Sequence, residues 1–183
     1  MAKLFISYSS KNKKMLDSFL EFLQLGMGVE RRDIFCTTYA GDLMSGEAFM
    51  EAIRLELYDC EAVISLVTEE YLKSKFCMAE MGAAWAMSKC YFPLIAVPLD
   101  RLKATPLYGL QLRRLNHHAD MGMVYDELLE CGISRRRQTS EFTRYLPGFI
   151  RKMNQLAGGE VMLSGDPAGC YRTTAGEIHK VNV

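Results

Sequence analysis

The feature of this sequence that most constrains its fold is the apolar run Ala62-Val63-Ile64-Ser65-Leu66-Val67. A run of this length is typical of a central strand in a parallel sheet, which helices cover on both faces. Comparable β-prone runs occur at residues 4–8, 33–38 and 92–97, and segments with helical spacing of apolar residues separate them. Strands that alternate with helices predict an α/β fold with a doubly wound, mainly parallel sheet.

The remaining elements follow from the same patterns. Helical spacing is found at residues 11–25, from the loop ending at 46 to about 58, and at 74–89, 121–131 and 140–156. Pro147 is expected to break or restart the last helix, and Trp85 is expected in the core. Residues 110–115 are a candidate fifth strand at the sheet edge. After residue 157 the pattern changes to short β-prone runs between Gly, Asp and Pro, so the predicted domains are 1–157 and a C-terminal β-rich extension at 158–183 packed on it.

Charge and cysteine usage exclude several classes of protein. The chain has 183 residues with 22 basic and 22 acidic side chains, and this balance argues against nucleic acid as a partner. The basic run Arg135-Arg136-Arg137 is interpreted as a solvated loop. The six cysteines form no C-x-x-C pair, which favours a reducing compartment over a disulfide scaffold or zinc site. Neither a signal peptide nor a membrane-spanning run is found, so we expect a cytoplasmic protein.

Glu80 is the residue whose surroundings are hardest to explain. On a helix its neighbours one turn away are Phe76, Cys77, Ala83 and Ala84, so the carboxylate lies on an apolar face. Acidic side chains are rarely buried without a partner, because burial of the charge is costly. Two readings stay open at this point: a structural glutamate paired inside the core, and a functional carboxylate.

Other candidate residues lie where the predicted strands end. Ligands of doubly wound sheets bind outside the carboxyl ends of the strands, where Ser7 to Ser10, the loop 38–46 and the segment after residue 67 converge. Each also has a structural reading: Ser9 and Ser10 as helix caps, and the loop glycines as turn residues. The pair His117 and His118 has no third ligand in view, so no metal site is predicted. Phosphate-loop, dinucleotide-fingerprint and nucleophile-elbow motifs are absent from the sequence.

The order of these segments resembles the TIR domain family over roughly residues 3–155. The opening Phe5-Ile6-Ser7-Tyr8-Ser9-Ser10 is similar to that family's first strand and polar turn, and Asp42 and Gly46 fall in the segment that resembles its BB loop. The stretch Ser74-Lys75-Phe76-Cys77-Met78-Ala79-Glu80 is similar to the S-x-aromatic-C-x-x-E motif of NAD-cleaving members. Phe76 departs from the tryptophan that is frequent there, and the segment after Gly158 has no counterpart.

This resemblance implies a flavodoxin-like fold with five strands, and NAD cleavage with Glu80 as the catalytic residue. It assigns NAD contacts to Ser7, Tyr8, Ser9, Asp42, Gly46, Phe76 and Cys77. NAD would be the substrate, with no prosthetic group. It further implies a homo-oligomer formed by TIR–TIR contacts and a separate effector, in antiphage defence, that responds to the product. A non-enzymatic TIR adaptor and a nucleoside N-glycosyltransferase are the alternatives.

Overall fold

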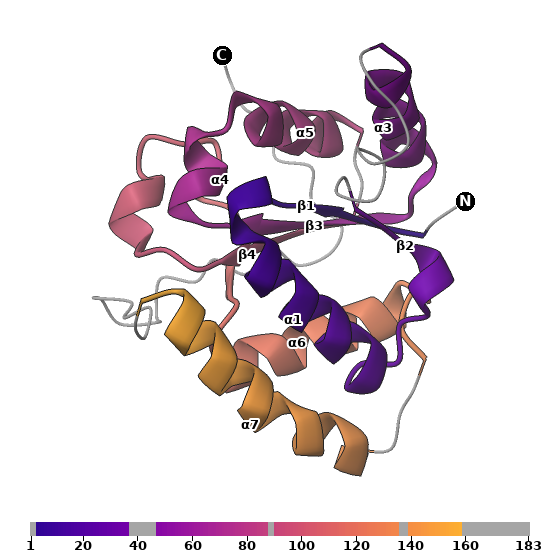
Figure 1. Ribbon diagram of the computed structural model, residues 1–183, viewed down its shortest axis with the longest axis vertical. Coiled ribbons are helices and arrows are strands. Elements are labelled where there is room, and N and C mark those ends of the chain that lie inside the picture. The colour runs from indigo at the N-terminus through magenta and orange to yellow at the C-terminus, as the bar shows by residue number, and fades with distance from the viewer. Residues whose placement is uncertain (1–2, 37–46, 88–89, 136–138, 159–183) are drawn as a thin grey trace.

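The computed structural model describes residues 3–36, 47–87, 90–135 and 139–158, and these form a single α/β unit around one sheet (Figure 1). The five strands are all parallel, in the order β2-β1-β3-β4-β5. They are β1 (Leu4–Ser7), β2 (Ile34–Cys36), β3 (Ala62–Val67), β4 (Cys90–Ile95) and β5 (Arg113–Arg114). This order confirms the flavodoxin-like, doubly wound sheet, whose strand order reverses between β1 and β3.

Helices cover both faces of the sheet, as the apolar strand runs predict. The helices are α1 (Lys13–Leu25), α3 (Glu47–Asp59), α4 (Glu69–Lys73), α5 (Lys75–Ala86), α6 (His118–Glu130) and α7 (Thr139–Leu156), with short 3-10 turns η1 (Ser10–Asn12), η2 (Arg31–Asp33) and η3 (Leu99–Leu102). In Figure 1, α1, α6 and α7 lie on one side of the sheet, and α3 and α5 lie on the other. Within the described residues, no helix combines the length and the apolar character that a membrane span needs.

The strand alternation decides which side chains meet which helices. Leu4 and Ile6 point into the core cluster shared with α1 and α7, whereas Phe5 packs with residues of α3 and α5. Because side chains alternate along a strand, Ser7 shares the face of Phe5. Ser7 stands in register with Ser65 of β3. Two serines therefore lie side by side on the face that α5 covers.

Helix α7 is continuous through Pro147, so the predicted break is wrong. A proline inside a helix costs about 3 kcal/mol. Here the apolar face of α7 packs on α1 on both sides of the proline, where Phe149 stacks on Phe22 at 4.3 Å between ring centroids and Leu146 is also buried. Pro147 itself is exposed, so its ring does not disturb this contact. Tertiary packing overrides the local preference.

The fourth strand differs from its predicted bounds. Strand β4 begins at Cys90 and ends at Ile95, earlier than the expected 92–97, and Pro93 lies inside it. The carbonyl of Ile95 accepts a hydrogen bond from the N–H of Leu115, so the backbone of Ile95 faces β5. Pro93 lies two residues earlier and therefore faces the same edge of the strand. The pairing of β4 with β5 begins only at Leu94. Proline is tolerated there because no strand needs its missing N–H.

Trp85 is 65% exposed and does not belong to the core. The buried residues of α5 are Cys77, Glu80, Met81 and Ala84, which form one stripe along the helix. Trp85 follows the last of them and is exposed to solvent. The loop 38–46 and the predicted β-rich extension, from residue 159 on, lie outside the described residues.

Candidate active site

The carboxyl ends of β1 and β3 and the start of α5 form the candidate site. Ser74 caps α5, because its side chain accepts a hydrogen bond from the N–H of Cys77 at 3.2 Å. Thr68 caps α4 in the same way, accepting from the N–H of Tyr71 at 3.1 Å. Each cap satisfies an N–H group that has no partner within its helix. They fix α5 so that its inward stripe places Glu80 over the end of β1.

Glu80 is buried, with 5% of its surface exposed. The hydroxyl of Ser7 donates a hydrogen bond to its Oε2 atom. Its Oε1 atom has no hydrogen-bond partner in the described part of the chain. Burial raises the pKa of Glu80 from 4.5 to about 7, and the Ser7 hydrogen bond opposes this rise. A buried carboxyl that changes charge near neutral pH, with one oxygen still able to accept, is suited to contact a substrate.

A cluster of hydroxyl groups continues from Ser7 beneath α5. The Tyr71 hydroxyl lies 3.1 Å from Ser7 Oγ, 2.9 Å from Ser65 Oγ and 3.1 Å from the carbonyl oxygen of Cys77. The Tyr91 hydroxyl lies 3.1 Å from Ser65 Oγ. Sequence reasoning did not assign Tyr71, Ser65 or Tyr91 to the site. The matching serines on strands one and three are the signal that points to them, because a polar side chain on a covered sheet face needs a partner.

The structure brings Ser7, Cys77 and Glu80 together. The Cys77 thiol is buried and lies 3.5 Å from the carbonyl oxygen of Tyr8. The Tyr8 side chain packs in the core cluster on the α1 face, and its backbone carbonyl adjoins Cys77. Burial raises the pKa of Cys77, and so does the nearby Glu80. The thiol is therefore neutral at neutral pH.

Ser9 and Phe76 lie at the margins of this group. Ser9 is buried at the start of η1, but its side chain makes no capping hydrogen bond; its carbonyl accepts from the N–H of Asn12 at 2.8 Å. Phe76 is half-buried against the cluster that contains Phe5 and Val63. Asp42 and Gly46, the other predicted contacts, lie outside the described residues.

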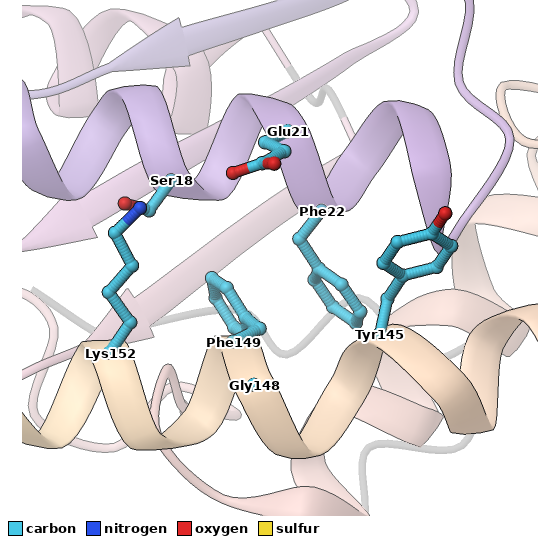
Figure 2. A pocket seen from close by; sticks show the side chains of 7 residues that line it. All are labelled: Ser18, Glu21, Phe22, Tyr145, Gly148, Phe149 and Lys152. Atoms are coloured by element: carbon cyan, nitrogen blue, oxygen red, sulfur yellow. The ribbon is translucent and has the colours of Figure 1, made fainter.

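A separate cavity of 170 Å³ lies between α1 and α7 (Figure 2), on the opposite side of the sheet from α5 (Figure 1). Its lining includes the aromatic rings of Phe22, Tyr145 and Phe149 and the charged side chains of Glu21 and Lys152. None of the residues predicted for the site lines it. The cavity is a surface gap between two packed helices. The candidate site with Ser7, Cys77 and Glu80 lies on the other side of the sheet.

The remaining candidates make structural contacts. His117 caps α6 by accepting from the N–H of Asp120, whose carboxylate pairs with Arg114 at 2.7 Å. Arg135, the described member of the basic run, pairs with Glu30. Within the described residues no group of three potential metal ligands is found. The described cysteines, at 36, 60, 77, 90 and 131, are all free thiols.

Comparison with known proteins identifies the family and supports the fold. The family model described as "TIR domain" matches residues 4–129. The uncharacterized protein YddK of Bacillus subtilis (strain 168) is 35% identical over 88 residues, which are 47% of this chain and only 32% of that protein. The TIR domain of the Toll-related receptor TRR-2 from Hydra magnipapillata has 18% identity and a TM-score of 0.50, covering 73% of this chain and 98% of that one. At such low identity the last match shows the fold alone. The family match, which includes Ser7, Tyr71 and Glu80, shows that this chain belongs to the TIR domain family.

Proposed function

We propose that this chain cleaves NAD at the bond between nicotinamide and ribose, with Glu80 as the catalytic carboxylate. The main support for the proposal is the burial and the hydrogen bonding of the Glu80 carboxylate. Glu80 is held by Ser7 on one oxygen, and its other oxygen is buried without a partner among the described residues. A structural glutamate would be expected to have both oxygens satisfied, because leaving one unpaired is costly.

The chemistry fits such a group. As the bond between ribose C1′ and the pyridinium nitrogen breaks, its electron pair stays on nicotinamide, which leaves as a neutral molecule and needs no acid. Positive charge develops on the ribose ring. An ionised Glu80 in a buried site stabilises that charge or binds the ribose hydroxyls through Oε1. Water then forms the new C1′–O bond and releases a proton, giving ADP-ribose; an internal hydroxyl would give a cyclic product, and another small molecule a conjugate.

The predicted contact residues receive roles within the same proposal. Phe76 is half-buried one turn before Glu80, where its ring can pack against a base or the ribose. Ser9 lies at the end of β1, two residues after Ser7. Asp42 and Gly46 are proposed to contact the rest of the dinucleotide on the basis of the family resemblance alone.

Assembly is the second part of the proposal. We infer that the active form is a homo-oligomer built by TIR–TIR contacts and that its product activates a separate effector. This inference rests on membership of the TIR domain family, whose members commonly self-associate. Family membership fits the alternative, a non-enzymatic adaptor, equally well, so activity must decide between them.

The test is to incubate the protein with NAD at low and high protein concentration and to identify products by chromatography and mass spectrometry. Nicotinamide release that rises faster than protein concentration supports an assembled enzyme, and the product mass identifies the acceptor. Absence of turnover at every concentration, together with concentration-dependent assembly, would favour the adaptor. Cleavage of free nucleosides in place of NAD would favour an N-glycosyltransferase.

A further inference from the structure

Hydroxyl groups of two strands and of α4 form a cluster beneath α5. Ser7 and Ser65 stand side by side on a sheet face whose other β1 and β3 residues, Phe5, Val63 and Val67, are apolar. Buried hydroxyls must be hydrogen-bonded, and an alanine at either position would avoid that requirement. The cluster is instead completed by Tyr71, which is fully buried, and by Tyr91. Its one charged neighbour in the described structure is Glu80, reached through Ser7.

The number of hydrogens in this cluster depends on Glu80. Tyr71 has one hydroxyl hydrogen, yet its oxygen lies within hydrogen-bond distance of Ser7 Oγ, Ser65 Oγ and the carbonyl of Cys77. The carbonyl can only accept, whereas a serine hydroxyl can accept or donate. When Glu80 is ionised, the hydrogen of Ser7 goes to the carboxylate. The single Tyr71 hydrogen can then be donated to Ser7, to Ser65 or to the Cys77 carbonyl, but to only one of them at a time.

Protonation of Glu80 removes that competition. A protonated carboxyl donates to Ser7, which frees the Ser7 hydrogen for Tyr71 and the Tyr71 hydrogen for the Cys77 carbonyl. Every oxygen pair from Glu80 through Ser7 and Tyr71 to the Cys77 carbonyl then has a hydrogen, and the Ser65 hydroxyl can donate its own hydrogen to Tyr71. In the ionised state, donation from Tyr71 to Ser7 strengthens the bond from Ser7 to the carboxylate, because successive hydrogen bonds polarise one another. The two charge states of Glu80 thus correspond to two orientations of the Tyr71 hydroxyl.

We propose that Tyr71 is a positioning residue for Glu80: its hydroxyl orients Ser7 and turns toward Ser7 when the carboxyl loses its proton. Tyr71 does not touch the reacting atoms and acts through Ser7. The kinetic consequence rests on the proposed NAD cleavage, but the coupling itself belongs to the substrate-free protein. The other titratable groups facing Glu80 among the described residues are Tyr71 and Cys77, and burial raises the pKa of both, so both stay neutral while Glu80 titrates.

The first test follows the Glu80 carboxyl by ¹³C NMR in protein without substrate. Tyr71→Phe should move the titration midpoint of Glu80 upward by roughly half a pH unit or more, because the ionised form loses its relayed donor. Ser7→Ala should also raise the midpoint, and adding Tyr71→Phe to Ser7→Ala should change nothing further. The proposal is wrong if Tyr71→Phe leaves the Glu80 midpoint unchanged. It is also wrong if Tyr71→Phe raises the midpoint as much in the Ser7→Ala variant as in the wild type. Tyr145→Phe on α7 is the matched control and should leave the midpoint unchanged.

The second test needs no variant and covers the case in which Tyr71→Phe does not fold. In the wild-type protein labelled at tyrosine ¹³Cζ, the Tyr71 signal should shift with the same midpoint as the Glu80 carboxyl. A Tyr71 signal that stays constant while Glu80 titrates would contradict the coupling.

Kinetics then separate this inference from the proposed function. Tyr71→Phe should lower kcat for NAD about tenfold with KM changed less than about twofold, because Tyr71 does not contact substrate. If Tyr71 and Glu80 titrate together but NAD is not cleaved, the positioning role of Tyr71 stands and the proposed enzymatic function is wrong. Turnover that requires Glu80 but is unaffected by Tyr71→Phe, with an unshifted midpoint, would reject the positioning role alone.

Discussion

Ser7 and Glu80, 73 residues apart in the chain, are joined by a hydrogen bond from the Ser7 hydroxyl to the carboxylate at the end of β1. This contact links the first strand to the helix that carries the candidate catalytic residue. It lies on the α5 face of the sheet, near the point where the strand order reverses. Ligands of doubly wound sheets bind at that point.

Replacing Glu80 by Gln should stabilise the protein, and the gain should depend on pH. The pKa of Glu80 is raised to about 7, so as pH rises from about 4.5 the unfolded chain loses this proton before the folded protein does. The stability of the wild type therefore falls between pH 4.5 and 7 and levels off above. The difference between Glu80→Gln and wild type should be about 2–3 kcal/mol larger at pH 8 than at pH 5.

Denaturant unfolding at the two pH values measures this difference. The exposed Glu61→Gln is the control and should show no comparable pH dependence. A Glu80→Gln variant less stable than wild type at pH 8 would mean that the carboxylate has a favourable partner in the fold.

Removing the Ser7 hydroxyl should move the pH dependence of NAD cleavage to higher pH. The Ser7 hydrogen bond lowers the pKa of Glu80, so Ser7→Ala raises it further. If the ionised carboxylate is the active form, kcat/KM should rise about tenfold per pH unit up to the pKa and then level off. Measured profiles should show the level region beginning at higher pH in Ser7→Ala. Ser18→Ala, which removes a buried hydroxyl on α1, should leave the profile unchanged.

Helix α7 should be part of the folded domain although the family match ends at residue 129. Phe149 stacks on Phe22 and is 5% exposed. Phe149→Ala should reduce the free energy of unfolding by about 3–5 kcal/mol, the usual cost of removing a buried aromatic ring. The exposed Arg151→Ala should change it by less than about 0.5 kcal/mol. Equal stability of the two variants would show that α7 packs independently of the core.

The cap of α5 should contribute to stability as well. Ser74 accepts from the N–H of Cys77, and its loss in Ser74→Ala leaves that donor without its capping partner. The expected cost is about 1 kcal/mol, measured as a lower midpoint of chemical unfolding. Lys75→Ala, at the exposed first residue of the helix, serves as the comparison and should have a much smaller effect.

The sequence predicted most of the fold because strand runs and helix caps are local signals. The run 62–67 became β3 with the same bounds, and α5 (Lys75–Ala86) lies within the predicted helical segment 74–89. Trp85 could not be placed because α5 is apolar on nearly every side, so hydrophobic spacing does not identify its inward face. Pro147 was misjudged because the contacts between α7 and α1 are long-range and leave no local signal.

Only part of the candidate site was predicted, because its other contacts join residues far apart in the chain. The inward position of Glu80 follows from its apolar neighbours on one helix, and the structure buries it. The hydroxyl cluster depends on register between strands far apart in the chain, since Ser7 meets Ser65 only through the pairing of β1 with β3. Tyr71 joins them from another helix, which no periodicity could indicate. The roles assigned to Asp42 and Gly46 stay predictions.

The catalytic role of Glu80 is tested by the rate of nicotinamide release from NAD by wild-type protein and by Glu80→Gln, both shown to be folded and equally assembled. We expect a loss of about 10³-fold in kcat for Glu80→Gln, as is usual when a charge-stabilising group is removed, and little change for Glu61→Gln. Turnover that persists in Glu80→Gln at a rate near that of the wild type would contradict the assignment of Glu80 as the catalytic carboxylate.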